Sequence, residues 1–498
     1  MKTKTEFSTF IKNFETTLHH LFHEERDIDQ LSLKRGLPSD ILEKIMYTKP
    51  LSVAIPTEYG GRGGHVKECL ELLSAASYES LSLSLTFGIN IALFLEPISK
   101  YAEASVKPGI FNRFMENQNM GGLMITEPDF GSDALNMKTF SKENELDYTI
   151  KGSKHWQGLT GMADYWLIAA RKKMDNGDLS RDVDFFIADN SKEKQHIIVE
   201  EIYDNAGLYM IPYGLNSLNL EIPKKQRLIP ETTGIKMMLD ILHRSRLQFP
   251  GMGAGFIKRM LDEATQYCKS RQVGAGNLLA MDQVQFQLSR IQSAFTISSA
   301  MCLRSAEISG LEHNLATNGL EANSMKTVVT DLMHESAQIL TQLSGASGYR
   351  MSHIGGRGIM DSRPFQIFEG SNEMLYSQIS EMVTRAMKKK KTPNLLAYLS
   401  SLELTAEASG YFKKELNFTI SSTLTQRKLV DLGRIIARIV SVGYVLDLGS
   451  KGFRKDLIDN SILMVQQEVS GLFSYFHFEN ATKIIEDYSS NSTWSKFA

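Results

Sequence analysis

Apolar residues recur every three or four positions through the first part of the chain, which is the spacing of one buried helix face. Phe10, Phe14 and Leu18 begin the first such stripe. The stretch from Ser80 to Leu95 carries no charge, but it is shorter than the roughly 20 residues that a membrane span needs. We therefore predict an N-terminal helical domain over residues 1–117, with a buried core helix and no transmembrane segment.

The period of the apolar residues changes near Gly121. The segments Tyr148–Ile150, Val183–Ile187 and Ser217–Ile222 alternate or are rich in β-branched residues, and turn residues separate them. No helical pattern of ordinary length lies between them, although parallel strands usually need such a crossover. These patterns predict a mostly antiparallel β domain over residues 118–230.

Helical periodicity returns after Gly234 and continues along the rest of the chain. The glycine-rich stretch Gly345–Gly358 is expected to interrupt the helices, and the lysine run Lys388–Lys391 is expected to form a solvated linker. We therefore predict a helical bundle over residues 231–391 and a separate helical extension over residues 392–498. The expected fold class is α+β.

The charge balance excludes several classes of protein. Lys and Arg total 55 and Asp and Glu total 57, so the formal net charge is −2. A chain that binds mainly nucleic acid or an anionic membrane is normally basic, so neither partner is expected. With 42% hydrophobic and 22% charged residues, the chain can bury large cores, which excludes wholesale disorder.

Cysteine and histidine positions predict neither a disulfide framework nor a metal site. The three cysteines are far apart and form no C-x-x-C pair. His19, His20 and His23 lie at helical spacing, but the sequence indicates no carboxylate or cysteine partner, so a solvated helix face is expected. The N-terminal residues lack the long apolar core of a secretory signal, and a cytoplasmic location is expected.

One glycine motif imitates a dinucleotide-binding loop. Gly251 and Gly253 are spaced as in that fingerprint and Gly255 lies nearby, but Phe256 stands where the third glycine is required. The motif also follows a helical segment rather than a strand. We therefore interpret these glycines as a site of close helix packing.

Three segments, in this order, resemble motifs of the acyl-CoA dehydrogenase family. The first is Gly121–Asp133, which contains Thr-Glu-Pro-Asp-Phe-Gly-Ser-Asp. The second is Lys151–Arg171, and the third comprises Gln342–Tyr349 and Ile367–Glu373. The resemblance covers residues 30–387 and implies an acyl-CoA dehydrogenase-like fold, with the last hundred or so residues outside the common core.

The resemblance implies FAD as the cofactor and α,β-dehydrogenation of an acyl-CoA thioester as the reaction, in fatty acid metabolism. Glu369 falls on the position of the base that removes the α proton, a role that a carboxylate performs best in a dry pocket. Gly370 would let the substrate approach the backbone. Electrons would then pass to an electron-transfer flavoprotein. Without the other motifs, Glu369 would be interpreted as a residue that caps or pairs near a helix start.

The resemblance also assigns the other site residues. Cofactor contacts are implied for Thr126, Ser132, Trp156, Gly158, Arg271, Gln283, Gln342, Gly345, Ser371 and Glu373. Substrate contacts are implied for Ser132, His243, Arg246 and Gly370. Of the cofactor set, Arg271, Gln283, Gln342 and Gly345 match residues that reach a neighbouring subunit's FAD, so a homodimer or homotetramer is expected. For Arg246 and Arg271, a surface ion pair is the alternative interpretation.

The sequence departs from the family pattern at several of these positions. Gly158 stands where the family usually has a threonine that bonds flavin N5, unless Leu159 or Thr160 shifts register to supply that contact. His243 replaces an aspartate, and Ala346 replaces a glycine. A flavin oxidase or a biosynthetic enzyme acting on a carrier-protein thioester is therefore an alternative function.

A nucleic-acid-binding flavoprotein of the alkylation-response type is a further alternative, but it requires a basic C-terminal domain, and acids and bases are comparable in number there. The extension carries its own apolar stripe, from Leu429 to Val440, which must be buried on the core or on a partner. If the extension folds separately, truncation at Lys391 should leave a core that still contains flavin.

Overall fold

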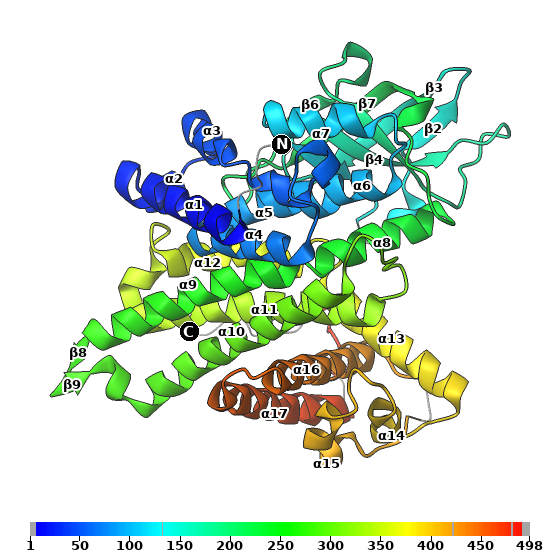
Figure 1. Ribbon diagram of the computed structural model, residues 1–498. Coiled ribbons are helices and arrows are strands. Elements are labelled where there is room, and N and C mark those ends of the chain that lie inside the picture. The colour runs from blue at the N-terminus through cyan, green and yellow to red at the C-terminus, as the bar shows by residue number, and fades with distance from the viewer. Residues whose placement is uncertain (1–5, 132, 421–422, 480–481, 491–498) are drawn as a thin grey trace.

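The computed structural model describes residues 6–131, 133–420, 423–479 and 482–490. The sheet and the N-terminal helices form one half of the molecule, and long helices cross its middle (Figure 1). The C-terminal helices lie on the opposite side of these long helices from the sheet (Figure 1). The predicted order of a helical domain, a β domain and a helical bundle is confirmed, and with it the α+β class.

The N-terminal domain is helical because its apolar stripes need a common core. Its helices are α1 (Phe7–His19), α2 (Ile28–Leu31), α3 (Ser39–Tyr47), α4 (Val66–Glu79), α5 (Leu81–Asn90), α6 (Glu96–Tyr101) and α7 (Lys107–Glu116). Among the described residues, one helical run is long and apolar enough to cross a membrane, Leu81–Tyr101, and its apolar window lies entirely inside the protein. The predicted core helix is therefore present, and α5 forms one wall of the site described below.

The β domain is one seven-stranded sheet in the order β1-β4-β2-β3-β7-β6, with β5 on β4. Its strands are β1 (Gly121–Met124), β2 (Phe140–Glu143), β3 (Asp147–His155), β4 (Tyr165–Lys172), β5 (Asp184–Asp189), β6 (Ile198–Ile202) and β7 (Gly214–Pro223). Most pairs are antiparallel, as predicted, but β4 pairs in parallel with both β1 and β2. These parallel pairs could not be predicted from the sequence, because strands instead of a helix make the crossovers. The β2–β3 hairpin connects β1 to β4, and β3 connects β2 to β4.

The C-terminal bundle consists of α8 (Gly234–Arg246), α9 (Phe249–Ser270), α10 (Asp282–Ile308), α11 (Gly319–Ser344), α12 (Ile354–Ser362) and α13 (Asn372–Lys390). The short strands β8 (Gln272–Val273) and β9 (Gly276–Asn277) form the hairpin tip between α9 and α10. α12 begins inside the stretch Gly345–Gly358, which was expected to break the helices. A Cβ at Gly358 would lie 3.1 Å from Phe256 Cζ, so tight packing explains that glycine better than chain flexibility.

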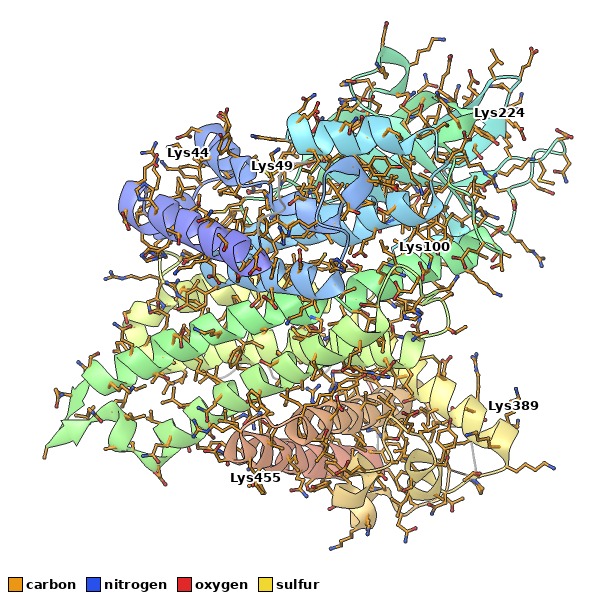
Figure 2. The ribbon with its side chains drawn as sticks, in the orientation of Figure 1. Lys44, Lys49, Lys100, Lys224, Lys389 and Lys455 are labelled. Atoms are coloured by element: carbon orange, nitrogen blue, oxygen red, sulfur yellow. The ribbon has the colours of Figure 1, made fainter. Side chains whose placement is uncertain are left out.

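The segment after α13 is not a detached appendage. It forms α14 (Leu395–Ser400), α15 (Lys413–Leu416), α16 (Gln426–Ser450) and α17 (Lys455–His477). α16 packs on α10, α11 and α13, and its predicted apolar stripe is buried there. The lysine run continues α13 as far as Lys390, with Lys389 projecting outward (Figure 2). The solvated linker is therefore shorter than predicted.

The glycines of the imitation fingerprint lie where α9 crosses two other helices. A Cβ at Gly255 would lie 1.9 Å from the Ser74 carbonyl oxygen of α4, and one at Gly253 would lie 2.3 Å from Val329 Cγ2 of α11. A Cβ at Gly251 would lie 2.9 Å from the Leu70 carbonyl oxygen. The interpretation as a close helix contact is confirmed, because backbone on α4 leaves no room for a side chain.

Replacing Gly255 by alanine should lower the free energy of unfolding by about 1–3 kcal/mol or more, because overpacking against backbone cannot relax through a rotamer change. The matched control is Gly471→Ala on α17, where no atom lies within 4 Å of the new Cβ. That change should stabilise the protein by about 0.5–1 kcal/mol through helix propensity. Thermal unfolding of both variants measures the difference, and equal melting temperatures would contradict the packing assignment.

Candidate active site

A cavity of about 230 Å³ lies where the sheet domain meets the helices. Its apolar wall includes Leu85 and Ile89 of α5 and Phe368, which precedes α13. Of the predicted site residues, the cavity wall brings together Thr126, Trp156, Gly158, Arg246, Glu369 and Gly370. Few convergent polar groups in an apolar cavity are typical of a small-molecule site.

Glu369 has the environment that a general base needs. One carboxylate oxygen, Oε1, accepts a hydrogen bond of 2.9 Å from Ser245 Oγ at the end of α8. The other, Oε2, is buried and has no partner among the described residues. Burial raises the pKa of Glu369 above its ordinary value, although Arg246, the Ser245 hydroxyl and Lys326 oppose that change. The carboxylate is therefore weakly solvated and more basic than an exposed one.

The rate of a reaction that uses Glu369 as base should rise with pH through the pKa of this group, because only the carboxylate accepts a proton. Since burial raises that pKa, the acid limb should lie above pH 4.5, the ordinary value for glutamate. Ser245→Ala removes a hydrogen bond that lowers the pKa, so it should move the limb to higher pH. A pH–rate profile of both proteins tests this, and a limb at or below the ordinary glutamate value would contradict it.

The backbone around Glu369 is unusual. Glu369 has φ +53° and Gly370 has φ +92°, both in the left-handed region that a glutamate rarely adopts. The Glu369 carbonyl oxygen accepts hydrogen bonds of 3.1 and 2.7 Å from Arg246 Nε and Nη2. Nη1 of Arg246 donates to Asn323 Oδ1 over 2.8 Å. The resemblance implied that Arg246 contacts the substrate; what the structure shows is that its guanidinium holds the Glu369 backbone.

Thr126 and Trp156 form the opposite wall of the cavity. Trp156 is 52% exposed, with φ +59°, and its ring lies 4.6 Å from that of Tyr203. Two residues that the sequence analysis did not single out hold this wall together. Lys154 Nζ forms a buried ion pair of 3.0 Å with Glu127 and donates to the Ile125 carbonyl oxygen over 2.8 Å.

The Glu127–Lys154 pair joins the first and second family motifs. Glu127 also accepts hydrogen bonds from the backbone N–H groups of Lys138 and Thr139. Burial disfavours the charged carboxylate, but Lys154 and these donors keep the pKa of Glu127 below its ordinary value. Glu127 directly follows Thr126, and Lys154 precedes Trp156 by two residues. The ion pair therefore fixes the spacing of Thr126 and Trp156. The only sequence signal was that both charged residues lie inside the two family motifs.

Gly158 lies in the cavity wall, and Ile89 fills the space beside it. A Cβ at Gly158 would lie 2.7 Å from Ile89 Cδ1, so a threonine there would require that side chain to move. Thr160 does not replace the missing hydroxyl in the cavity wall. It is fully buried, donates to the Gln157 carbonyl oxygen over 2.8 Å and accepts from Asn216. The register shift to Thr160 therefore finds no support.

Three predicted site residues on α8 and at the start of α13 lie outside the cavity wall. His243 is buried, and its Nδ1 lies 2.7 Å from the Leu315 carbonyl oxygen; burial and Arg246 lower its pKa to about 4, so it is neutral near pH 7. Ser371 caps α13 by accepting from the Met374 N–H, and Glu373 is exposed in the first turn of that helix. Ser132 lies outside the described residues.

Four predicted cofactor residues are exposed and far from the cavity. Arg271 and Gln283 flank the β8–β9 tip, at the end of the long helices away from α8 and α13 (Figure 1). Gln342 and Gly345 lie at the end of α11, about 24 Å of helix away from Lys326 at its cavity end. The predicted cofactor residues therefore form two separate groups in one chain, as expected if the second group serves a neighbouring chain.

One group in the described part of the chain has the spacing of a metal site. Ligand atoms of His19, His23 and Glu79 lie within 4.8 Å of one another, so the carboxylate that the sequence did not indicate is supplied by α4. His23 Nε2 lies 2.7 Å from Glu79 Oε2, and Arg259 Nη1 lies 3.3 Å from the same oxygen. The guanidinium already balances this carboxylate, and the contacts are those of an ion-pair cluster joining three helices.

The cavity fits a flavin ring. Trp156 offers an exposed aromatic face, and the hydrogen bonds of Thr126 to described residues use only its carbonyl oxygen, which leaves its hydroxyl available. The backbone N–H groups of Glu369 and Gly370 also donate to no described residue. Thr126 and Trp156 would hold the ring of FAD, and the exposed residues at the helix ends would hold its adenosine part in a neighbouring chain.

Comparisons with known proteins identify the family of the chain. The chain matches the acyl-CoA dehydrogenase middle domain over residues 122–219 and the acyl-CoA dehydrogenase C-terminal domain over residues 232–384. It is 24% identical over 344 residues to an acyl-CoA dehydrogenase of Bacillus subtilis (strain 168), covering 68% of this chain and 87% of that protein.

Two further matches bear on partners and fold. The chain is 25% identical over 375 residues to the caffeyl-CoA reductase-Etf complex subunit CarC of Acetobacterium woodii, covering 73% of this chain and 93% of that one. It resembles the structure of an acyl-CoA dehydrogenase complexed with FAD from Bacillus anthracis, with a TM-score of 0.77, 17% identity, and coverage of 96% and 90% of the two chains. The chain therefore belongs to the acyl-CoA dehydrogenase family, whose cofactor is FAD.

Proposed function

We propose that this protein dehydrogenates an acyl-CoA thioester between its α and β carbons. The observation that carries the proposal is the weakly solvated Glu369 carboxylate, whose Oε2 has no partner among the described residues, in an apolar cavity that Thr126 and Trp156 also line. Glu369 removes the α proton. When bound, FAD supplies the acceptor for the hydride that leaves the β carbon.

The backbone of the same segment supports the developing enolate. The Glu369 N–H donates to no other described residue, so it is available to a thioester oxygen on which negative charge develops. Its position depends on Arg246, which holds the carbonyl oxygen of the same residue. Leu85, Ile89 and Phe368 exclude water from the acyl chain, which keeps the carboxylate basic.

Two partners are proposed, a second copy of this chain and an electron-transfer flavoprotein, and each rests on a separate observation. A homodimer is the smallest assembly that would bring Arg271 and Gln342 of one chain to the cavity of another, because one chain holds them at the far ends of its helices. An electron-transfer flavoprotein is the proposed acceptor, since a relative that matches 73% of this chain is a subunit of an Etf complex.

Flavin reduction under argon tests the function. Purified protein is mixed with acyl-CoAs of increasing chain length and branching, and with the same acyl groups on a carrier protein. Rapid bleaching by at least one acyl-CoA is expected, with the enoyl-CoA as product. Bleaching only by the carrier-protein thioesters would replace this function with the biosynthetic alternative, and no bleaching by any thioester would refute both.

A further inference from the structure

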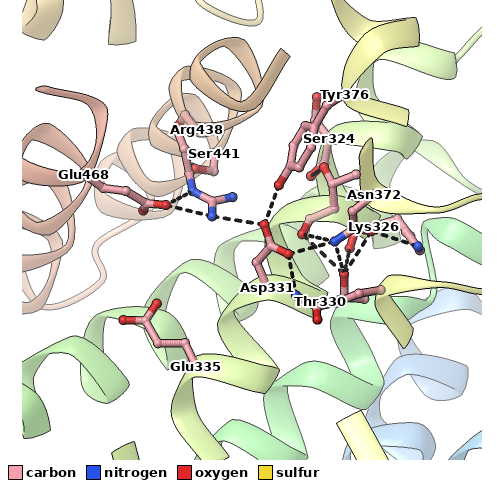
Figure 3. A network of polar contacts seen from close by, with 12 residues as sticks. Ser324, Lys326, Thr330, Asp331, Glu335, Asn372, Tyr376, Arg438, Ser441 and Glu468 are labelled. Atoms are coloured by element: carbon pink, nitrogen blue, oxygen red, sulfur yellow. Dashed lines mark hydrogen bonds and ion pairs between the residues drawn. The ribbon is translucent and has the colours of Figure 1, made fainter. Parts of the chain in front are cut away.

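The carboxylate of Asp331 contacts both ends of the segment that carries Glu369. Asp331 of α11 accepts hydrogen bonds at the same oxygen, Oδ1, from Gln366 Nε2 over 2.7 Å and from Asn372 Nδ2 over 2.8 Å. Gln366 precedes Glu369 by three residues and Asn372 follows it by three. One oxygen therefore ties both ends of the Gln366–Asn372 segment to the same helix. Figure 3 shows the contact between Asp331 and Asn372.

Lys326 fixes the middle of the segment. Its Nζ donates to the Gly370 carbonyl oxygen over 2.8 Å and to Asn372 Oδ1 over 2.9 Å, one to two turns along α11 from Asp331. The left-handed backbone of Glu369 and Gly370 is costly, and such conformations persist only where the surroundings over-determine them. Asp331 and Lys326 supply that constraint.

The cation that faces Asp331 comes from the C-terminal helices. Arg438 of α16 is buried, and its Nη2 lies 3.4 Å from Asp331 Oδ2 and 2.8 Å from Glu468 of α17 (Figure 3). Tyr376 also donates to Asp331 Oδ2, over 2.6 Å. Without the guanidinium, the partly exposed carboxylates of Asp331 and Glu468 would repel each other, and Asp331 would lose the contact that holds it in place.

We propose that Asp331 and Arg438 are positioning residues for Glu369, so that the C-terminal helical segment is a working part of the active site. Arg438 holds the Asp331 side chain in place, and Asp331 holds the Gln366–Asn372 segment in its left-handed conformation. The effect on the rate rests on the proposed function; the effect on the segment's order does not. Both residues act through the backbone and touch no reacting atom.

The test compares Arg438→Met, Arg438→Lys and Asp331→Asn in the full-length, FAD-loaded protein. The matched control is Arg427→Met, which breaks a 3.3 Å ion pair with Asp431 at the start of the same helix and the hydrogen bonds to the Tyr475 and Phe478 carbonyl oxygens. Backbone amide hydrogen exchange of the Gln366–Asn372 segment is measured without substrate. Arg438→Met and Asp331→Asn should speed this exchange by about tenfold or more, and Arg427→Met should not.

Flavin reduction by an acyl-CoA is the second readout, expressed per bound flavin. Displacement of a base by a fraction of an ångström is expected to slow reduction by about 10- to 100-fold in Arg438→Met, with substrate KM little changed. Arg438→Lys keeps the charge and should recover part of the rate, and it also serves if Arg438→Met fails to fold.

The outcomes separate the two proposals. Wild-type exchange rates in both Arg438→Met and Asp331→Asn would overturn the positioning role and leave the proposed function intact. If no thioester reduces the wild-type flavin, the proposed function fails, and exchange alone still decides whether Arg438 orders the segment. Faster exchange with an unchanged rate of flavin reduction would also overturn the role in catalysis.

Discussion

Glu369→Gln should give a yellow, folded protein whose flavin is reduced by an acyl-CoA about 10²–10⁴ times more slowly than in the wild type. Glutamine keeps the shape of the side chain, and its amide oxygen can still accept from Ser245 Oγ. The amide cannot accept the α proton. The new NH₂ group would take the place of Oε2, which is already buried and unpartnered in the wild type, so the fold is expected to survive the change.

Anaerobic stopped-flow absorbance, normalised to bound FAD, measures the effect of Glu369→Gln. Glu335→Gln is a suitable control, because this carboxylate lies on α11 and pairs with Arg290 rather than contacting the cavity. It should react at the wild-type rate. Reduction of the Glu369→Gln flavin at the wild-type rate would mean that another group removes the proton.

Truncation after Lys391 should abolish the soluble, flavin-containing protein, contrary to the expectation from sequence that a core survives. α16 covers α13, whose buried apolar side chains are Leu375, Tyr376, Ile379, Val383 and Met387. Exposing one such side chain costs about 1.5–3 kcal/mol. Uncovering several of them therefore cancels a total stability of about 5–15 kcal/mol.

The contact that makes α16 inseparable from the core is close. A Cβ at Gly433 would lie 2.0 Å from the Tyr376 carbonyl oxygen, so the two helix backbones touch there. Truncation after Phe478, which leaves α16 and α17 whole, is the control and should keep its flavin. Soluble fraction, FAD content and thermal unfolding are compared for the two truncations. A yellow, cooperatively unfolding protein ending at Lys391 would show that the extension is dispensable.

Much of the fold could be predicted from the sequence, because the apolar periods are local properties. The stripes in α1, α9, α10 and α16 and the strands β3, β5 and β7 are confirmed. The parallel pairs of β4 could not be predicted, since they depend on which strands meet after a hairpin intervenes. The helix α12 was also missed: its glycines lower helix propensity, and the packing against Phe256 that favours them is not visible along the chain.

The site residues also fall into those that could be predicted from the sequence and those that could not. Glu369, Thr126 and Trp156 stood out because they fall within short motifs, and the structure places all three on one cavity. Asp331, Arg438 and the Glu127–Lys154 pair did not, because their partners are distant in sequence and a single charge in a helix gives no periodic signal. The sequence also could not show that Arg246 holds the Glu369 carbonyl oxygen, a contact made across the fold.

The left-handed backbone at Glu369 lowers the stability of the fold, whereas the proposed reaction needs the glutamate at this position. Holding a glutamate at φ +53° costs on the order of 1–3 kcal/mol, whereas glycine adopts that conformation without a penalty. A single change to glycine would relax the chain and remove the base together, and the gain would offset the lost hydrogen bond to Ser245. On the proposed function, a chain selected for folding alone would therefore gain from this change, and the result would be an inert flavin carrier.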